Sequence, residues 1–206
     1  MKNTKVLSLL SVAVFLLTGC KKQCSKDEFI NLANKVEKHQ YAKATATCKG
    51  KVSTKTNGIN ESYEPNDTFN FIYKNGEWTY DGDASSLKAF RQSLILSCSL
   101  IMSLNVKDLL NQDPFLTEGD REGLTCYSSP LGFNYKTTYD NAKQDAIGYA
   151  ATVNGSSETT YTFDNNNGAV LEYIEKSDLD VEMNVNGTPV NTKSVTDLTL
   201  NFSYSD

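Results

Sequence analysis

The stretch DLDVEMNV, residues 178–185, decides the fold class of this chain. Apolar residues occupy every second position from Leu179 to Val185, and Asp, Glu or Asn stands between them. A period of two predicts a β-strand with one face in water and the other face covered. The stretch LTLNFSY, residues 198–204, alternates in the same way and predicts a closing strand. We therefore expect the C-terminal part of the chain to form an antiparallel sheet with one buried face.

The sequence before these two stretches contains further strand patterns. They are runs of apolar and β-branched residues separated by Gly, Asn, Ser and Pro, which favour turns. These runs predict strands at residues 124–127, 131–139, 146–153 and 159–163, and a turn at residues 165–168.

Two earlier segments also predict strands. Asn75-Gly76 is a tight-turn signal, and it predicts a hairpin from the aromatic-rich strands on either side of it, residues 69–80. From Tyr41 onward, small residues alternate with Lys and Thr, which predicts a half-buried strand. The expected buried residues of this strand are Ala42, Ala44, Ala46 and Cys48.

Three segments have helical spacing. Ser25 is followed three residues later by Glu28, a capping pair that predicts a helix running to about His39. Residues 87–102 place apolar side chains on more than one side of a helix. Asn105 is expected to cap a further short helix.

The N-terminus has the features of a secretory signal. Lys2 and Lys5 give it a positive charge, and an apolar run follows at residues 6–17. This run is too short for a transmembrane helix, which needs roughly 20 apolar residues. We therefore expect residues 1–19 to be a removable signal peptide.

The end of this signal, Leu17-Thr18-Gly19-Cys20, resembles the lipobox of bacterial lipoproteins. The resemblance implies that Cys20 receives a diacylglyceryl group and becomes the first residue of the mature chain. Two acyl chains hold a protein stably on a membrane, whereas one chain binds only marginally. Residues 20–26 are then the lipidated cysteine and a short polar tether, and residues 27–206 are a single globular domain.

These elements predict an α+β fold. We expect a long, twisted antiparallel sheet, a half-barrel, packed against an N-terminal helix and inserted helices. The pattern resembles half-barrel lipoproteins of the LolA/LolB and LppX/LprG kind, in the lipobox, the N-terminal helix at residues 29–36, the YKNGEW hairpin at residues 73–78 and the long strands at residues 169–204. The resemblance implies a hollow that holds acyl chains.

Charge and anchoring predict where the protein acts. Loss of Lys2 and Lys5 with the signal leaves 18 basic and 25 acidic residues, a net charge of −7. Such a surface does not favour nucleic acid. We expect an extracytoplasmic protein, anchored through acyl chains on Cys20 to the outer leaflet of the cell membrane, or to the outer membrane if the source has two membranes. The sequence indicates no particular protein partner.

The cysteines other than Cys20 are even in number: Cys24, Cys48, Cys98 and Cys126. Disulfides persist outside the cytoplasm, and four cysteines allow three pairings. Cys98 and Cys126 both lie among apolar neighbours and are the pair we expect, with buried free thiols as the alternative. The chain has no CxxC pair and one histidine, so we expect no metal site and no cofactor.

The sequence contains no pattern of an enzyme. His39 is the only imidazole, and neither GxSxG nor HExxH is present. Asp81 and Asp83, beside Gly82, are interpreted as turn and cap residues rather than an acid/base pair. Gly168 is the fifth residue counted from Asp164, whereas the calcium loop of an EF-hand needs its glycine at the sixth position. We therefore expect residues 164–168 to form a turn.

Two functions from different classes are compatible with this sequence. One is the binding or carriage of a lipid or other apolar ligand beside the membrane, and the other is a surface interaction protein without a small ligand. Small residues on the first long strand leave room for a ligand, and the aromatic strand residues are candidates to line a hollow. The predicted ligand face comprises Ala42, Ala44, Ala46, Phe90 and Leu94.

Overall fold

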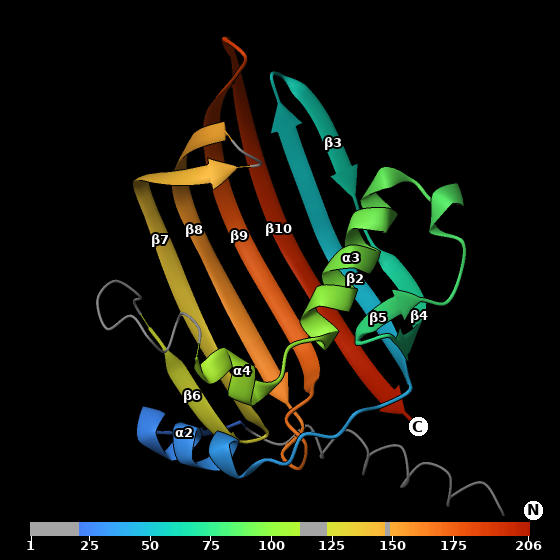
Figure 1. Ribbon diagram of the computed structural model, residues 1–206. Coiled ribbons are helices and arrows are strands. Elements are labelled where there is room, and N and C mark those ends of the chain that lie inside the picture. The colour runs from blue at the N-terminus through green and yellow to red at the C-terminus, as the bar shows by residue number, and fades with distance from the viewer. Residues whose placement is uncertain (1–20, 112–122, 147–148) are drawn as a thin grey trace, which may run out of the picture.

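The computed structural model of the chain describes residues 21–111, 123–146 and 149–206. They form an open antiparallel sheet with helices at one end and along one side (Figure 1). The strands are β1 (Lys22–Cys24), β2 (Lys43–Thr56), β3 (Ile59–Tyr63), β4 (Asn66–Lys74), β5 (Glu77–Tyr80), β6 (Thr125–Ser129), β7 (Leu131–Ala146), β8 (Tyr149–Phe163), β9 (Val170–Val185) and β10 (Thr188–Ser205). The helices are α2 (Lys26–Lys35), α3 (Ala89–Met102) and α4 (Val106–Leu110), with a 3-10 turn at Ala84–Ser86. The predicted α+β class is confirmed.

The sheet runs in the order β1-β6-β7-β8-β9-β10-β2-β4-β5, with β3 paired to the outer part of β2. Strands β7 to β10 are 15 to 18 residues long and make a curved wall (Figure 1). The last strand, β10, pairs along β2, so the C-terminal strand lies inside the sheet beside the first long strand. The helices between β5 and β6 pack on the concave face of this wall.

The convex face carries charges in alternating order. Lys136, Glu158, Lys176, Asp197 and Lys51 lie directly opposite one another across β7, β8, β9, β10 and β2. Directly opposed unlike charges each contribute roughly 0.2–1 kcal/mol. The row therefore favours this register and keeps the convex face in water.

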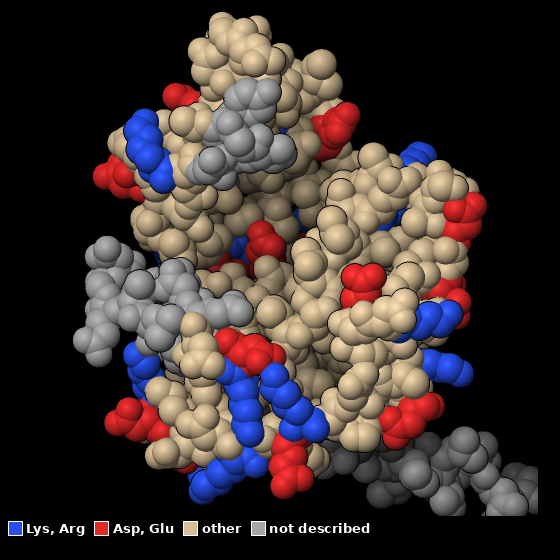
Figure 2. Space-filling model, viewed as in Figure 1, with Lys and Arg blue, Asp and Glu red and all other residues tan. Residues whose placement is uncertain are grey.

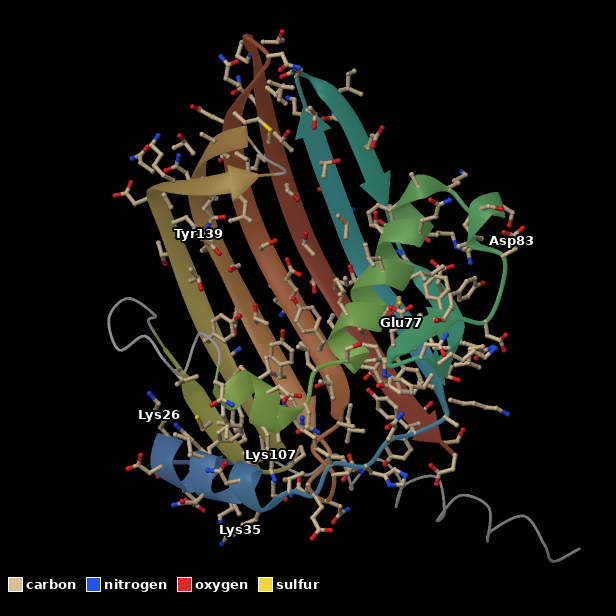
Figure 3. All side chains as sticks on the ribbon, viewed as in Figure 1. Lys26, Lys35, Glu77, Asp83, Lys107 and Tyr139 are labelled. Atoms are coloured by element: carbon tan, nitrogen blue, oxygen red, sulfur yellow. The ribbon has the colours of Figure 1, made fainter. Side chains whose placement is uncertain are left out.

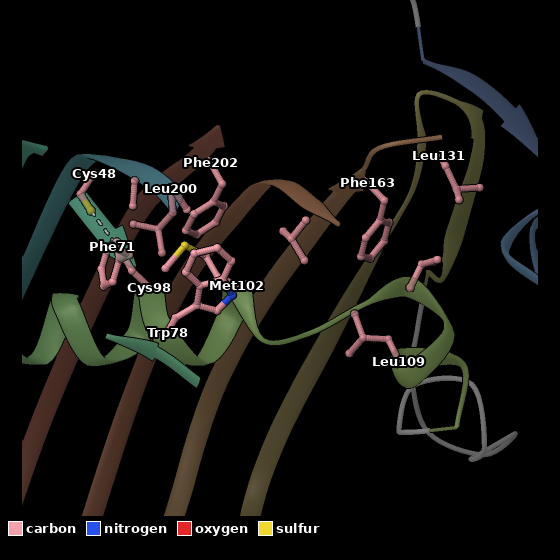
Figure 4. Close-up of a cluster of buried hydrophobic side chains, with 14 of the residues drawn as sticks. Cys48, Phe71, Trp78, Cys98, Met102, Leu109, Leu131, Phe163, Leu200 and Phe202 are labelled. Carbon is pink, nitrogen blue, oxygen red and sulfur yellow. Dashed lines mark hydrogen bonds between the residues drawn. The ribbon is translucent and has the colours of Figure 1, made fainter. Parts of the chain in front are cut away.

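The concave face is closed at one end by α2 and α4. Phe29 and Ala33 of α2 are fully buried, and the Phe29 ring meets the Phe133 ring of β7 edge-on at 5.8 Å. Val106 of α4 is also fully buried. Farther along the sheet, Cys98 and the apolar residues of α3 pack on β2, β4 and β10. Together with the residues at the closed end they form one continuous hydrophobic core (Figure 4).

The two helix caps and the tight turn that the sequence predicts are present in the structure. The Ser25 hydroxyl accepts a hydrogen bond from the Glu28 amide at 3.1 Å and begins α2. The Asn105 side chain accepts from the Lys107 amide at 3.1 Å and begins α4. Asn75 has φ 55°, a left-handed conformation that suits the turn between β4 and β5. These predictions are confirmed.

The N-terminal segment differs from the expected tether and helix. Helix α2 ends at Lys35, four residues before His39. Residues Lys22–Cys24, expected to be part of a polar tether, form β1 against β6. Three residues are too few to reveal a period of two, and β6 supplies the backbone partners that hold this strand.

Strand β8 replaces two predicted strands, because residues 154–158 continue the ladder and do not turn. Gly155 has φ 120° and lies so close to β9 that an added Cβ would collide with the carbonyl oxygen of Asp178. Glycine therefore lets β8 pass this point as a bent strand. The Gly-Ser-Ser sequence resembles a loop only when the neighbouring strands are unknown.

We predict that Ala46→Leu destabilises the fold by about 1–3 kcal/mol, because Ala46 is completely buried and a larger side chain overpacks the core. Thr47→Leu is the matched control, because Thr47 faces the opposite side of β2 and is only half-buried. The measurement is urea denaturation of both variants. Equal stability of the two variants would show that the core beside Ala46 has room to spare.

Candidate functional site

The concave face changes chemistry along the strands. Near the closed end, a row of directly opposed residues contains Phe133, Tyr161, Tyr173, Leu200 and Cys48. The next row contains Tyr135, Thr159, Glu175, Leu198 and Gly50, and the third contains Thr137, Ser157, Ser177, Thr196 and Val52. The face therefore passes from apolar and aromatic residues to small hydroxyl residues.

Aromatic rings make the floor where the first two rows meet. Tyr161 lies 5.1 Å from Phe133 and 5.1 Å from Tyr173, measured between ring centroids. Tyr135 stacks on Phe133 at 6.1 Å. Tyr161 and Tyr173 are only partly covered. This floor presents ring faces and hydroxyl groups together.

Glu175 is the carboxylate of this floor. Its Oε2 atom accepts a hydrogen bond from the Tyr173 hydroxyl at 3.0 Å. Among the residues that the structure describes, no Lys, Arg or His lies within ion-pair distance of Glu175. The concave face of the sheet therefore carries a carboxylate that has no counter-ion among the described residues.

Burial and Glu175 both act on the tyrosines of the floor. Burial raises the pKa of Tyr173 far above its ordinary value, and the negative charge of Glu175 raises it further. Burial also raises the pKa of Tyr161, with additional effects from Tyr135 and Glu175. Both hydroxyls therefore stay protonated at neutral pH and act as hydrogen-bond donors.

The face of the molecule is hollowed between the sheet wall and α3 (Figure 2). Leu96 and Leu100 of α3 stand one helical turn apart, and each is 61% exposed. Exposed leucines one turn apart on the surface of a helix form an apolar strip. The floor of the hollow therefore carries tyrosines and a carboxylate, and the bordering helix carries an apolar strip on the side turned away from the core.

A second concavity lies beside the C-terminal end of β10 and has a volume of about 340 Å³. Its charged side chains already have partners: the Lys38 amine is 2.7 Å from Asp108, and the His39 ring is 2.9 Å from Asp206. Tyr41 stacks on Tyr204 at 5.1 Å within it. Because these groups satisfy one another, we take the hollow with Glu175 as the candidate site.

The structure places the predicted ligand face mostly inside the packed core. Ala44, Ala46 and Leu94 are buried, Phe90 packs on the Tyr63 ring at 4.2 Å, and Ala42 is exposed. Helix α3 occupies the space that the small residues of β2 leave free. These residues thus allow the helix to approach the sheet and do not form the floor of the hollow.

The described cysteines are free thiols, so the expected bond between Cys98 and Cys126 is not present. The two cysteines have different sulfur neighbours. Cys98 lies against Cys48, with 3.6 Å between the sulfur atoms, and Cys126 is directly opposite Cys24 across β1 and β6. Apolar neighbours in the sequence indicated that both residues are buried, but not which cysteine each one contacts.

Cys20 and the signal peptide, residues 1–19, lie outside the described residues. None of the described helices has the length and apolar character needed to cross a membrane. Within the same described part of the chain, no three His, Cys, Asp or Glu side chains gather as metal ligands would.

The chain matches no described protein family, no curated protein and no solved structure. The resemblance to half-barrel lipoproteins therefore stays a prediction that rests on the lipobox, the hairpin and the strand pattern.

Sequence reasoning did not single out Tyr161, Tyr173 and Glu175. The signal that could identify Tyr173 and Glu175 is a change of residue type along one face of β9. Tyr173, Glu175 and Ser177 share this face, and the same face is apolar farther along the chain at Leu179 and Val181. A carboxylate on the covered face of a strand is costly unless it has partners or a ligand.

We predict that stability falls as pH rises above about 10, because tyrosines of the unfolded chain ionise near that pH. Tyr161, Tyr173 and Tyr204 have pKa values raised first by burial, so they keep their protons in the fold. The unfolded state then holds fewer protons, and alkali favours it.

The measurement is urea denaturation from pH 8 to 11.5, combined with absorbance titration of the 11 tyrosines. Tyr173→Phe should show a shallower loss of stability with pH. Ionisation of all tyrosines near pH 10 in the intact fold would contradict this prediction.

Proposed function

We propose that this chain is a membrane-anchored extracytoplasmic lipoprotein that binds a lipid or similar amphiphile in the hollow between its sheet and α3. The observation that carries the ligand proposal is Glu175, a carboxylate without a described counter-ion on an otherwise aromatic floor. A closed core would fill this position with an apolar residue.

The anchoring part of the proposal rests on the sequence. A positive start, a short apolar run and Leu17-Thr18-Gly19-Cys20 stand in the order that a lipoprotein signal requires. Acyl chains on Cys20 would place the domain beside membrane lipid. A ligand of lipid type would then be present at high local concentration.

The floor of the hollow and the exposed side of α3 suit the two parts of an amphiphile. Leu96 and Leu100 offer apolar area to a hydrocarbon chain. Tyr161 and Tyr173 offer ring faces, and Glu175 offers a negative charge, to a polar head group, which suits an amine or quaternary ammonium best. The small hydroxyl residues beyond them leave space for the rest of the ligand.

The closed end of the sheet is the end we assign to the membrane. Lys26 and Lys35 of α2 and Lys107 of α4 stand at this end (Figure 3). Lys21, the first described residue, is 3.8 Å from Glu172 near the same end. Lysines close to an acyl anchor favour anionic membrane surfaces.

We predict that Cys20→Ala abolishes lipid attachment and leaves an uncut precursor, because the thiol accepts the diacylglyceryl group and cleavage depends on it. The measurement is metabolic labelling with palmitate together with the mobility of the chain on a gel. Equal labelling of the variant and the wild type would refute anchoring through Cys20.

We predict that Ser157→Phe blocks ligand binding, because Ser157 points into the hollow beside Ser177. Ser156→Phe is the matched control, because the same substitution one residue earlier points to the convex face. The chain from Lys21 onward is purified, extracted with organic solvent and examined by mass spectrometry. We expect bound lipid in the wild type and in Ser156→Phe, and loss of lipid in Ser157→Phe.

If the folded wild type carries no lipid and binds no added amphiphile, the protein is better explained as a surface interaction protein without a small ligand. Loss of lipid in both variants would show that the substitution acts through folding, and circular dichroism of each variant distinguishes that case.

We predict that Glu175→Gln weakens binding of dodecyltrimethylammonium by about 10- to 100-fold, because the variant removes a charge attraction of roughly 1.5–3 kcal/mol, the value at about 5–10 Å and an effective dielectric constant of about 20. Dodecyl sulfate, with the same chain and the opposite charge, should not lose affinity. Glu158→Gln is the control, because Glu158 lies on the convex face. Equal affinity of wild type and Glu175→Gln for the cation would exclude Glu175 as the head-group site.

A further inference from the structure

The four described cysteines stand as two facing pairs. Cys24 of β1 is directly opposite Cys126 of β6 in the antiparallel register. Cys48 of β2 and Cys98 of α3 have their sulfur atoms 3.6 Å apart. Each cysteine therefore has one cysteine neighbour, and no described thiol is left over.

The pair across β1 and β6 has the geometry of a disulfide. Directly opposed residues of antiparallel strands point to the same face, with Cα atoms roughly 4.5–5.5 Å apart. Disulfides span Cα separations of roughly 4.4–6.8 Å. Cys126 is buried and Cys24 is partly exposed, so an oxidant reaches this pair through Cys24.

The pair between β2 and α3 is completely enclosed. Cys48 and Cys98 are both inaccessible to solvent. Figure 4 shows the two side chains facing one another between β2 and α3. Burial raises the pKa of a thiol because it disfavours the charged thiolate, which is the species that reacts. Oxidation of this pair must therefore come before α3 settles on the sheet, and the finished bond is shielded from reductants.

We propose that the chain forms two disulfides under oxidising conditions, Cys24–Cys126 and Cys48–Cys98. In each case two S–H groups give up two protons and two electrons, and one S–S bond forms. The electrons and protons pass to the disulfide of a thiol–disulfide exchange oxidant, which becomes two thiols. Formation of the bonds in the cell rests on the proposed extracytoplasmic location, whereas the pairing itself rests on the fold.

The Cys24–Cys126 bond would strengthen the attachment of the anchored N-terminal segment to the sheet. Cys24 is four residues after Cys20, and β1 has only three residues. Without a covalent bond, a pull on the acylated end is opposed by the short ladder between β1 and β6 and by surface contacts such as Lys21–Glu172. With the bond, the pull passes directly to the sheet, and the anchored segment cannot peel away.

The second bond would act on the hollow. Cys98 lies in the C-terminal half of α3, two residues from Leu96 and two from Leu100. A bond to β2 fixes the distance of this helix from the sheet. The width of the hollow is then set covalently on one side.

The test uses the full chain, produced with its own N-terminus, blocked with N-ethylmaleimide at lysis and digested without reduction. Mass spectrometry should find the Cys24–Cys126 and Cys48–Cys98 peptides. Dithiothreitol without denaturant should open Cys24–Cys126 alone, because both sulfurs of the other pair are buried. Cys24→Ser should leave Cys126 free and Cys48–Cys98 intact, with a melting temperature lower by about 10 °C.

A second arm refolds the reduced chain in oxidised and reduced glutathione, which tests the pairing apart from location. Both predicted bonds should form. Four free thiols after this treatment, or a Cys98–Cys126 peptide, would overturn the pairing. Correct bonds in glutathione with free thiols in the cell would overturn the extracytoplasmic location and leave the pairing established.

Discussion

One continuous ladder of backbone hydrogen bonds, from β7 through β8, β9 and β10 to β2, assigns every side chain of the sheet to a face. Because side chains alternate along a strand, a slip of one residue in any of these pairs would exchange the two faces. The same register sets Lys136 against Glu158 on the outside and Phe133 against Tyr161 on the inside. The core, the hollow and the cysteine contacts all depend on this register.

Local sequence patterns predict much of the fold. The alternation at residues 178–185, the Asn75-Gly76 turn and the Ser25 and Asn105 caps each depend on neighbours in the sequence, and each prediction was correct. The errors concern contacts between distant segments. The small residues of β2 allow a close neighbour, but only the position of α3 determines that this neighbour is a helix. The partner of Cys98 depends on the same position.

The concave face also explains why the site was harder to predict than the fold. Thr159 and Ser177 are buried polar residues beside Glu175, at positions where a closed core would use Val or Leu. Such departures from core chemistry are expected where a protein keeps a surface for a ligand. They form one surface only after the register places β8 beside β9, because Thr159 comes from β8 whereas Glu175 and Ser177 come from β9.

The outer edges of the sheet limit contact between copies of the chain. The terminal strands β1 and β5 have three and four residues, so each offers few free backbone groups. Among the described residues, β7 beyond Asn134 pairs only with β8, and this open edge is interrupted by a bulge after Tyr139 and carries Lys136 and Lys143. Short, bulged and charged edges resist strand-to-strand addition. Copies of the chain at high local concentration would therefore stay separate instead of joining through their strand edges.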